Sequence, residues 1–262
     1  MRRIRYEIEP EMVRVPAGYF WLGSDESDPD ALEEESPRHW LYLPEFWIGR
    51  YPVTVAQFAA FVKDTGYTTT STNIVTGWWW PPLPGHWQPL RGKDDHPMTW
   101  LSWYDAIAYC RWLSEGTDRR YTLPSEAEWE KAARGDDGRI YPWGDEWNPD
   151  RCNASEGRIG DTTPVGFYSP RGDSPYGCAD MGGNAWEWTR SLWGKDYGIP
   201  VFLYPYASTD GREDTGAPRE IQRIIRGGSF TSDRLFVRCA FRLSYRPRDG
   251  YLGIGFRVAA FQ

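Results

Sequence analysis

The chain has 262 residues, enough for one large domain or two small ones, and carries a formal net charge of −7. This acidic balance argues against a nucleic-acid partner, and no run of eighteen uncharged apolar residues exists that could span a membrane. The basic start of the chain is followed by no apolar stretch, so we expect no secretory signal and a cytoplasmic location.

The first third of the chain is typical of short strands followed by a capped helix. Residues 12–23 alternate and turn like a hairpin, and residues 40–48 read as a further strand. An acidic run between them, residues 25–35, reads as a solvated loop. A helix is predicted from Val53-Thr54 through about residue 64, with Thr54 as its N-cap.

Two more helices are predicted in the middle of the chain. Ser102 can cap a helix over 103–114, and Pro124 stands near the start of a short helix that ends before Gly135. Residues 67–99 form a Trp- and Pro-rich excursion, and residues 135–180 are almost all turns. Since no linker of low complexity divides the chain, we expect residues 1–262 to form a single domain.

The composition predicts a large irregular fraction. The chain holds 16 tryptophans, 27 glycines and 21 prolines, so large aromatic side chains are expected to fill gaps between loops. Arginine outnumbers lysine by 26 to 4, a bias that indicates a GC-rich or heat-loving source.

Side chains with catalytic potential are sparse. His39, His86 and His96 are isolated in sequence and are expected to be packed or hydrogen-bonded rather than metal ligands. The glutamates at 126, 128 and 130 are spaced i and i+2 on a helix, so they share no face and are not an acid/base pair. Bonding to backbone or arginine is the better interpretation.

The four cysteines, Cys110, Cys152, Cys178 and Cys239, are widely spaced and form no CxxC pair. They fit neither a zinc site nor a disulfide-dense scaffold, so free thiols in a reducing cytoplasm are expected. A single bridge between Cys152 and Cys178 remains an open alternative.

The C-terminal segment has an unusual composition. Between two strand-like ends, residues 224–227 and 254–258, aromatic residues are mixed with arginines without strand or helix period. Pro247, Gly250 and Gly253 interrupt this stretch, so we predict that it is a loop. Aromatic and arginine side chains on a loop are typical of a binding surface, although aromatics that plug the core would have the same pattern.

Ordered motifs along most of the chain resemble one family. They run from Val15-Pro-Ala-Gly and Tyr51-Pro-Val-Thr54 through Tyr121-Thr-Leu-Pro-Ser-Glu-Ala-Glu-Trp-Glu to Gly183-Asn-Ala-Trp-Glu-Trp-Thr189, Arg226-Gly-Gly-Ser229 and Gly255-Phe-Arg257. Together they resemble the formylglycine-generating-enzyme, or sulfatase-modifying factor, family over residues 11–260. The resemblance implies an α+β, C-type-lectin-like fold with small antiparallel sheets, few helices and many irregular loops.

Two loop segments, residues 153–158 and 180–187, carry oxygen-bearing side chains and could hold calcium, which prefers hard oxygen donors in loops. Hydrogen-bonded turns without metal are the alternative that spacing alone favours. The family resemblance implies two structural calcium sites, in which Ala154, Arg158, Gly183 and Ala185 would serve through backbone carbonyls. The implied ligand sets are Asn153, Ala154, Glu156 and Arg158, and Asp180, Gly183, Ala185 and Glu187.

The chain departs from the family at the catalytic centre. Members that make formylglycine hold copper with two cysteines, three and eight residues after the serine of the Arg-Gly-Gly-Ser motif. Here these positions are Ser232 and Val237, and Cys239 occupies a different slot. Since a single thiol cannot replace a copper(I) dithiolate, we expect no copper and no oxidase chemistry. A formylglycine-generating-type oxidoreductase, or another enzyme of the family, is the alternative function.

The end of the chain also resembles the variable proteins encoded by diversity-generating retroelements, which use the same fold as a scaffold. Their C-termini carry Arg-Gly-Gly-Ser-aromatic, scattered variable positions, Arg-Cys-Ala-x-Arg and Ile-Gly-Phe-Arg-Val, as this chain does. Adenine-directed mutagenesis of Asn codons reaches the residue types present here. The resemblance implies a diversifiable surface over about residues 230–253 that binds a protein or peptide. The candidate binding residues are Phe230, Phe236, Phe241, Leu243, Ser244, Tyr245, Arg246, Arg248, Gly250, Tyr251 and Leu252.

Overall fold

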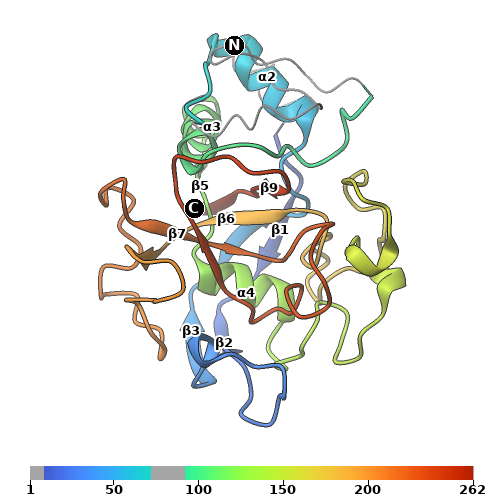
Figure 1. Ribbon diagram of the computed structural model, residues 1–262. Helices are drawn as coiled ribbons and strands as arrows, with labels where there is room; N and C mark the ends of the chain where they lie inside the picture. Colours follow the sequence, from blue (N-terminus) through green and yellow to red (C-terminus); the bar gives the residue numbers. More distant parts are fainter. Residues whose placement is uncertain (1–8, 72–91, 262) are drawn as a thin grey trace.

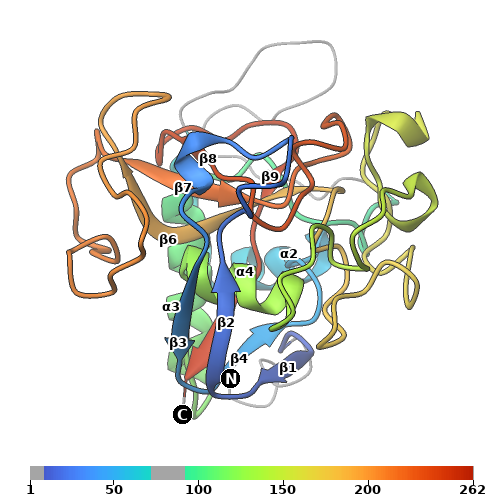
Figure 2. The same ribbon diagram turned by 90° about the horizontal axis from the view of Figure 1, so that it is seen from below.

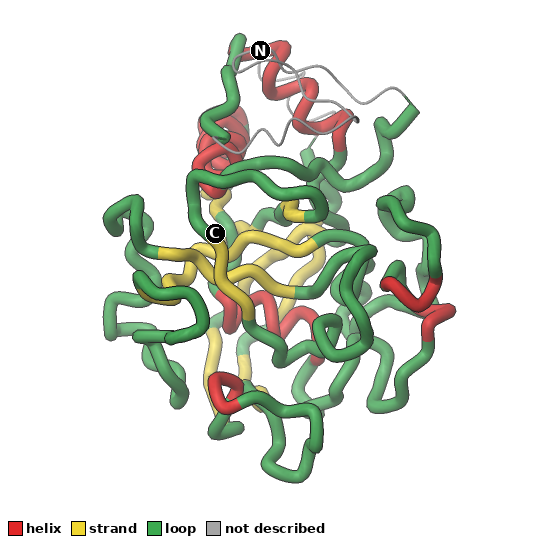
Figure 3. The backbone as a smooth tube through the Cα atoms, in the orientation of Figure 1, coloured by secondary structure: helices red, strands yellow, loops and turns green. Residues whose placement is uncertain are grey.

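The computed structural model describes residues 9–71 and 92–261 (Figure 1). The tryptophans at 78–80 and His86, part of the predicted Trp-rich excursion, lie outside the described residues. In the described part, three small sheets surround the helix α4 (Glu126–Arg134), while α2 (Val55–Thr65) and α3 (Trp103–Gly116) lie together at one end. Loops make up much of the chain (Figure 3).

The first sheet joins distant parts of the sequence. Its order is β1 (Met12–Val15), β4 (Phe46–Gly49), β10 (Ala259–Phe261) and β5 (Arg120–Thr122), all antiparallel. The last strand of the described chain therefore lies between two strands from its first half.

The predicted hairpin over residues 12–23 is wrong. β1 pairs with β4, whereas β2 (Gly18–Leu22) pairs with β3 (His39–Leu43) in a separate two-stranded sheet, which lies below α4 in Figure 1 and toward the viewer in Figure 2. The predicted strand over 40–48 is likewise two strands, β3 and β4, which belong to different sheets. The reason is tertiary packing, because Phe20 and Leu22 of β2 are buried in a core cluster that holds α4 residues as well as Val15 of β1, so the two strands contact one core from different sheets.

The third sheet carries the C-terminal segment. Its order is β8 (Leu243–Tyr245), β7 (Gln222–Arg226), β6 (Trp186–Gly194) and β9 (Ile254–Gly255), and β6 pairs with β9 in parallel. The prediction that the stretch between residues 227 and 254 is loop is wrong at β8, which pairs antiparallel with the fully buried β7. The rest of the segment has no regular strand or helix.

The helices follow their local signals. Thr54, Ser102 and Ser125 each cap a helix, and each accepts a hydrogen bond from the backbone N–H three residues on, at 3.1–3.3 Å. In each case the residue at that third position bonds back to the cap, completing a capping box. The predicted caps Thr54 and Ser102 are confirmed. Gly66, at φ 66°, ends α2 in the left-handed conformation that glycine adopts without strain.

The three glutamates of α4 are structural, as the sequence predicts. Each lies in the core and pairs with an arginine, because a buried carboxylate is stable only when it is paired and hydrogen-bonded. The pairs are Glu126 with Arg242, Glu128 with Arg190, and Glu130 with Arg226 and Arg134.

Candidate ligand-binding site

Buried arginines fix the C-terminal segment to the core. Arg242 Nε and Nη2 donate to the two carboxylate oxygens of Glu126 at 2.8 and 2.9 Å, and both side chains are fully buried. Arg238 pairs in the same bidentate way with Glu35, at 2.7 and 2.8 Å. The segment between β7 and β9 is therefore anchored at two points, and its outward-facing side chains stand on a fixed backbone.

Part of the predicted binding surface is buried. Phe230, Phe241, Ser244 and Gly250 are buried, so the prediction that these residues face solvent is wrong. Phe241 packs with Trp186 in the core cluster, with ring centroids 5.9 Å apart. The unperiodic pattern did not reveal this burial, because it depends on the segment folding back over β6. Phe236, Leu243 and Tyr245 are half-buried.

Four predicted binding residues are exposed: Arg246, Arg248, Tyr251 and Leu252. Tyr251 is 48% exposed and Leu252 is 39% exposed. The Tyr251 ring lies 5.9 Å from the ring of Tyr245 and 6.4 Å from that of Trp100. We call Trp100, Tyr245, Tyr251 and Leu252 the aromatic patch.

The turn that carries Tyr251 is held by Gly250. Its N–H donates to Ser71 Oγ at 2.9 Å, and a Cβ added at this position would lie 2.2 Å from the carbonyl oxygen of Trp100. Only glycine permits this close approach of two backbones. The aromatic patch is thus positioned by backbone packing rather than by its own side chains.

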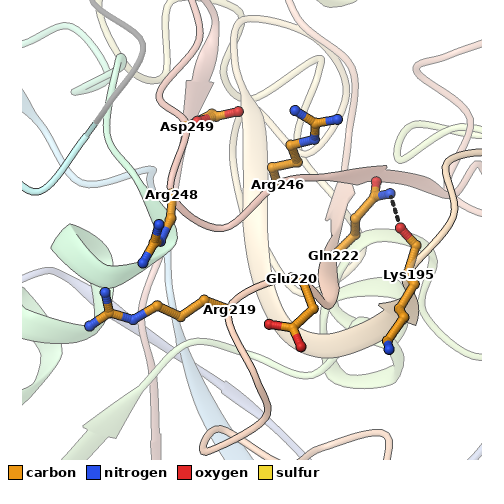
Figure 4. A pocket seen from close by; sticks show the side chains of 7 residues that line it. All are labelled: Lys195, Arg219, Glu220, Gln222, Arg246, Arg248 and Asp249. Carbon is orange, nitrogen blue, oxygen red and sulfur yellow. Dashed lines mark hydrogen bonds between the residues drawn. The ribbon is translucent and has the colours of Figure 1, made fainter.

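A pocket of about 700 Å³ lies beside the aromatic patch, where the turn after β8 meets the loop between β6 and β7 (Figure 4). An adjoining hollow of about 430 Å³ shares part of this lining and adds Asp196, Tyr197 and Tyr245. Only Arg246 and Arg248 of the lining were predicted to bind. Residues 195 and 219–221 come from the loop between β6 and β7, and Gln222 is the first residue of β7. None of them belongs to a recognisable motif, so no local signal could have found them. The lining residues are Lys195, Arg219, Glu220, Gln222, Arg246, Arg248 and Asp249.

The positions of the copper-binding cysteines do not fit copper. Ser232 is buried, and its hydroxyl accepts a hydrogen bond from the Ser229 N–H at 3.0 Å, while Val237 is a fully buried apolar side chain. All four cysteines are free and buried. Burial raises the pKa of the Cys239 thiol to about 12, which disfavours the thiolate form that binds metal.

The second calcium set does not fit a metal ion either. Both carboxylate oxygens of Glu187 accept hydrogen bonds from Arg257, at 2.6 and 2.7 Å, and Trp129 Nε1 donates a third at 2.6 Å. The charge of Glu187 is therefore already neutralised. Burial raises the pKa of Asp180 to about 6, although its carboxylate accepts the Gly166 N–H at 2.7 Å. Gly183 and Ala185 adjoin this pair on the same bend.

The first calcium set fits in one respect. Asn153 is buried, and its Oδ1 has no hydrogen-bond partner among the described residues, as a carbonyl ligand awaiting a cation would. Ala154 is buried beside it, whereas Glu156 and Arg158 are exposed. Glu156 Oε1 accepts the backbone N–H of Arg234 at 2.9 Å and its Oε2 accepts the Ser155 hydroxyl at 3.1 Å, so both carboxylate oxygens already accept hydrogen bonds.

Metal-binding groups and membrane-spanning helices are absent from residues 9–71 and 92–261. No group of three or more His, Cys, Asp or Glu side chains gathers there in a way that could hold a metal ion. In the same ranges, no helix has the length and apolar character needed to cross a membrane.

Small antiparallel sheets, few helices and long aromatic-rich loops define a C-type-lectin-like fold of the formylglycine-generating-enzyme type. The sulfatase-modifying factor enzyme 1-like domain matches residues 3–261, and the chain belongs to this family. The formylglycine-generating enzyme of Thermomonospora curvata is 34% identical over 310 residues, covering 99% of this chain and 96% of that protein. The inactive C-alpha-formylglycine-generating enzyme 2 of Mus musculus is 34% identical, covering 92% and 88%.

Solved structures agree on the fold. PvdO from Pseudomonas aeruginosa superposes with a TM-score of 0.77 at 28% identity, covering 97% of this chain and 95% of that one. Treponema denticola variable protein 1 superposes with a TM-score of 0.67 at 20% identity, covering 95% and 94%. The expected fold class is therefore confirmed, and a variable protein shares it.

Proposed function

We propose that this chain is a binding member of its family, which uses the aromatic patch to recognise a protein or peptide. The observation that carries the proposal is that Tyr251 and Leu252 project from a turn whose backbone is fixed by Gly250, while Arg242 anchors the same segment in the core. A large exposed aromatic side chain on a rigid support loses little entropy when it is buried by a partner.

The proposal extends to how the surface arose. Exposed residues alternate with core residues in the C-terminal segment, so Tyr251, Leu252, Arg246 and Arg248 can change without loss of the fold. Such a division suits a diversity-generating retroelement, as in the variable proteins that the segment resembles. A neighbouring reverse-transcriptase gene, with a near-copy of the last hundred or so bases differing only at adenines, would support this origin. If neither the gene nor the near-copy were present, this proposed origin would be wrong.

A selection experiment tests the binding function. A displayed library of random peptides is selected against the immobilised protein, and the enriched peptides are measured by fluorescence anisotropy. Tyr251→Ala should weaken their binding at least about tenfold, because an aromatic anchor is lost. Tyr42→Ala is the matched control, since Tyr42 is 51% exposed on the distant β3. Equal binding to both variants, or no enrichment, contradicts the proposal.

The alternative is a formylglycine-generating-type oxidoreductase, which the 34% identity to the Thermomonospora curvata enzyme favours. Against it stand Ser232 and Val237 at the positions where the resemblance places the copper ligands, together with the buried, protonated thiol of Cys239. Incubation with copper(I), oxygen and a cysteine-bearing sulfatase-type peptide distinguishes the two functions. Aldehyde formation above a copper-only blank would overturn the binding proposal.

A further inference from the structure

The pocket beside the aromatic patch has a charge opposite to that of the whole chain. Its lining holds four cationic side chains, Lys195, Arg219, Arg246 and Arg248, and two carboxylates, Glu220 and Asp249. The chain as a whole carries −7. A local excess of positive charge inside a hollow raises the concentration of anions there and steers their approach.

Two of the three arginines that line the pocket extend to the same side of it. Figure 4 shows the guanidinium ends of Arg219 and Arg248, which come from different segments, on one side of the view, whereas the guanidinium of Arg246 points to the other side. Arg219 is exposed, and within the described part of the chain its guanidinium makes no salt bridge, although it lies over the Tyr104 ring at 5.6 Å. Two like charges on the same side of a pocket repel each other, and an anion bound there would relieve this repulsion.

The base of the pocket is rigid. Gln222 is buried, its Nε2 donates to the Lys195 carbonyl and its Oε1 accepts from Ser244 Oγ, both at 2.9 Å. The pairing of β7 with β8 places Tyr245 opposite Arg223, so the turn with Arg246 starts at a fixed register. The charged groups are therefore presented from a supported framework, as a binding site requires.

Apolar groups border the charged ones. Tyr197 and Tyr245 line the adjoining hollow, which shares Lys195, Gln222, Arg246 and Asp249 with the pocket. Beyond Tyr197 the loop exposes a run of large apolar side chains, Ile199, Val201 and Leu203, which are 57–67% exposed. An extended ligand could thus place a carboxylate in the pocket and an aromatic or aliphatic side chain beside Tyr197 and Tyr245.

We propose that this pocket binds carboxylate side chains of an acidic segment of the partner protein, next to an apolar side chain of the same segment. The inference rests on the proposed function and specifies the chemistry of its partner. A peptide suits the site better than a free anion, because the hollow is continuous with the aromatic patch through Tyr245 and with the apolar loop through Tyr197.

The test uses two labelled, end-capped pentapeptides, Glu-Glu-Phe-Glu-Glu and its neutral counterpart Gln-Gln-Phe-Gln-Gln. The acidic peptide should bind at least about tenfold more tightly, and more weakly when sodium chloride rises from about 0.05 to about 0.3 M. The double variant Arg219→Gln with Arg246→Gln should lose this preference. Arg111→Gln is the matched control, an exposed arginine on α3 away from the pocket. Melting temperatures verify that each variant is folded.

The outcomes separate this inference from the proposed function. Equal binding of both peptides, or an unaffected double variant, overturns the inference. Displacement of the acidic peptide by an equal concentration of inorganic phosphate also overturns it, since the pocket would then be a small-anion site. If library peptides depend on Tyr251 but not on Arg219, the proposed function stands and the inference fails. If acidic peptides depend on Arg219 and no peptide depends on Tyr251, the recognition surface is the pocket and the aromatic patch proposal fails.

Discussion

Replacing Arg242 by Met tests whether the C-terminal segment is anchored through the core. Arg242 is fully buried, pairs with Glu126 through two hydrogen bonds and also donates to the Glu34 carbonyl at 2.7 Å. The substitution keeps an unbranched apolar stem but removes the guanidinium group, so Glu126 is left as a buried carboxylate without its main partner. Removing one partner of a buried ion pair costs about 3–5 kcal/mol.

We expect Arg242→Met to lower the free energy of unfolding by an amount near the lower end of this range, because Glu126 keeps other partners. Arg212 Nη1 lies 3.6 Å from Glu126 Oε1, and the Tyr204 hydroxyl lies 3.4 Å from Oε2, so two weaker partners remain. A loss of about 3 kcal/mol corresponds to a fall in melting temperature of about 6–12 °C for a chain of this size. Thermal unfolding followed by circular dichroism or calorimetry measures it. Adding Glu126→Gln to Arg242→Met should recover part of the loss, because the buried charge is then absent.

Arg246→Met is the matched control, since Arg246 is exposed four residues further along the same segment. Its effect should stay within about 0.5 kcal/mol. If Arg242→Met lowers the melting temperature no more than Arg246→Met does, the division of the segment into core anchors and free surface residues is refuted.

Three further predictions concern other parts of the chain. Gly250→Ala places a Cβ 2.2 Å from the Trp100 carbonyl oxygen and should cost about 1–3 kcal/mol while weakening peptide binding. At Gly157 a Cβ would meet no described atom within 4 Å apart from its chain neighbours, so Gly157→Ala should change neither stability nor peptide binding. We propose one structural calcium ion at Asn153. Calcium should then raise the melting temperature of the wild type but not that of Asn153→Ala. Elemental analysis that finds no metal would contradict this proposal. Thr54→Ala should destabilise the chain by about 1 kcal/mol, and an unchanged melting temperature would deny its capping role.

The sequence allowed the helices to be predicted because their signals are local. Thr54 and Ser102 each lie three residues before the group that they cap, so the interaction can be inferred from neighbouring letters. The ends of α2 and α4 are likewise marked by Gly66 and Gly135. The family and its fold followed from ordered motifs spread over most of the chain, and the match over residues 3–261 confirms both.

Strand pairing could not be predicted in the same way. β10 lies between β4 and β5, although more than a hundred residues separate each of these strands from it in sequence. A hairpin over residues 12–23 was the simplest prediction from the local pattern. It was wrong because Phe20 and Leu22 are buried in the core cluster that contains α4 residues. Such burial depends on tertiary packing that a short window does not contain.

The candidate site was predicted only in part for a related reason. Aromatic residues without period can lie inside or outside, so Tyr251 and Phe241 look alike in sequence although one is exposed and the other packs on Trp186. The pocket also needs Lys195 and Arg219, which meet the C-terminal segment only after β7 and β8 pair.

The most direct test of the binding function maps where a selected peptide contacts the protein. Hydrogen–deuterium exchange is measured with and without a peptide enriched from the library, at a concentration that saturates binding. We predict slowed exchange in residues 243–252, which carry Tyr245 and Tyr251, and in the facing loop over 195–221. Slowed exchange confined to other parts of the chain, with no change in residues 243–252, would contradict it.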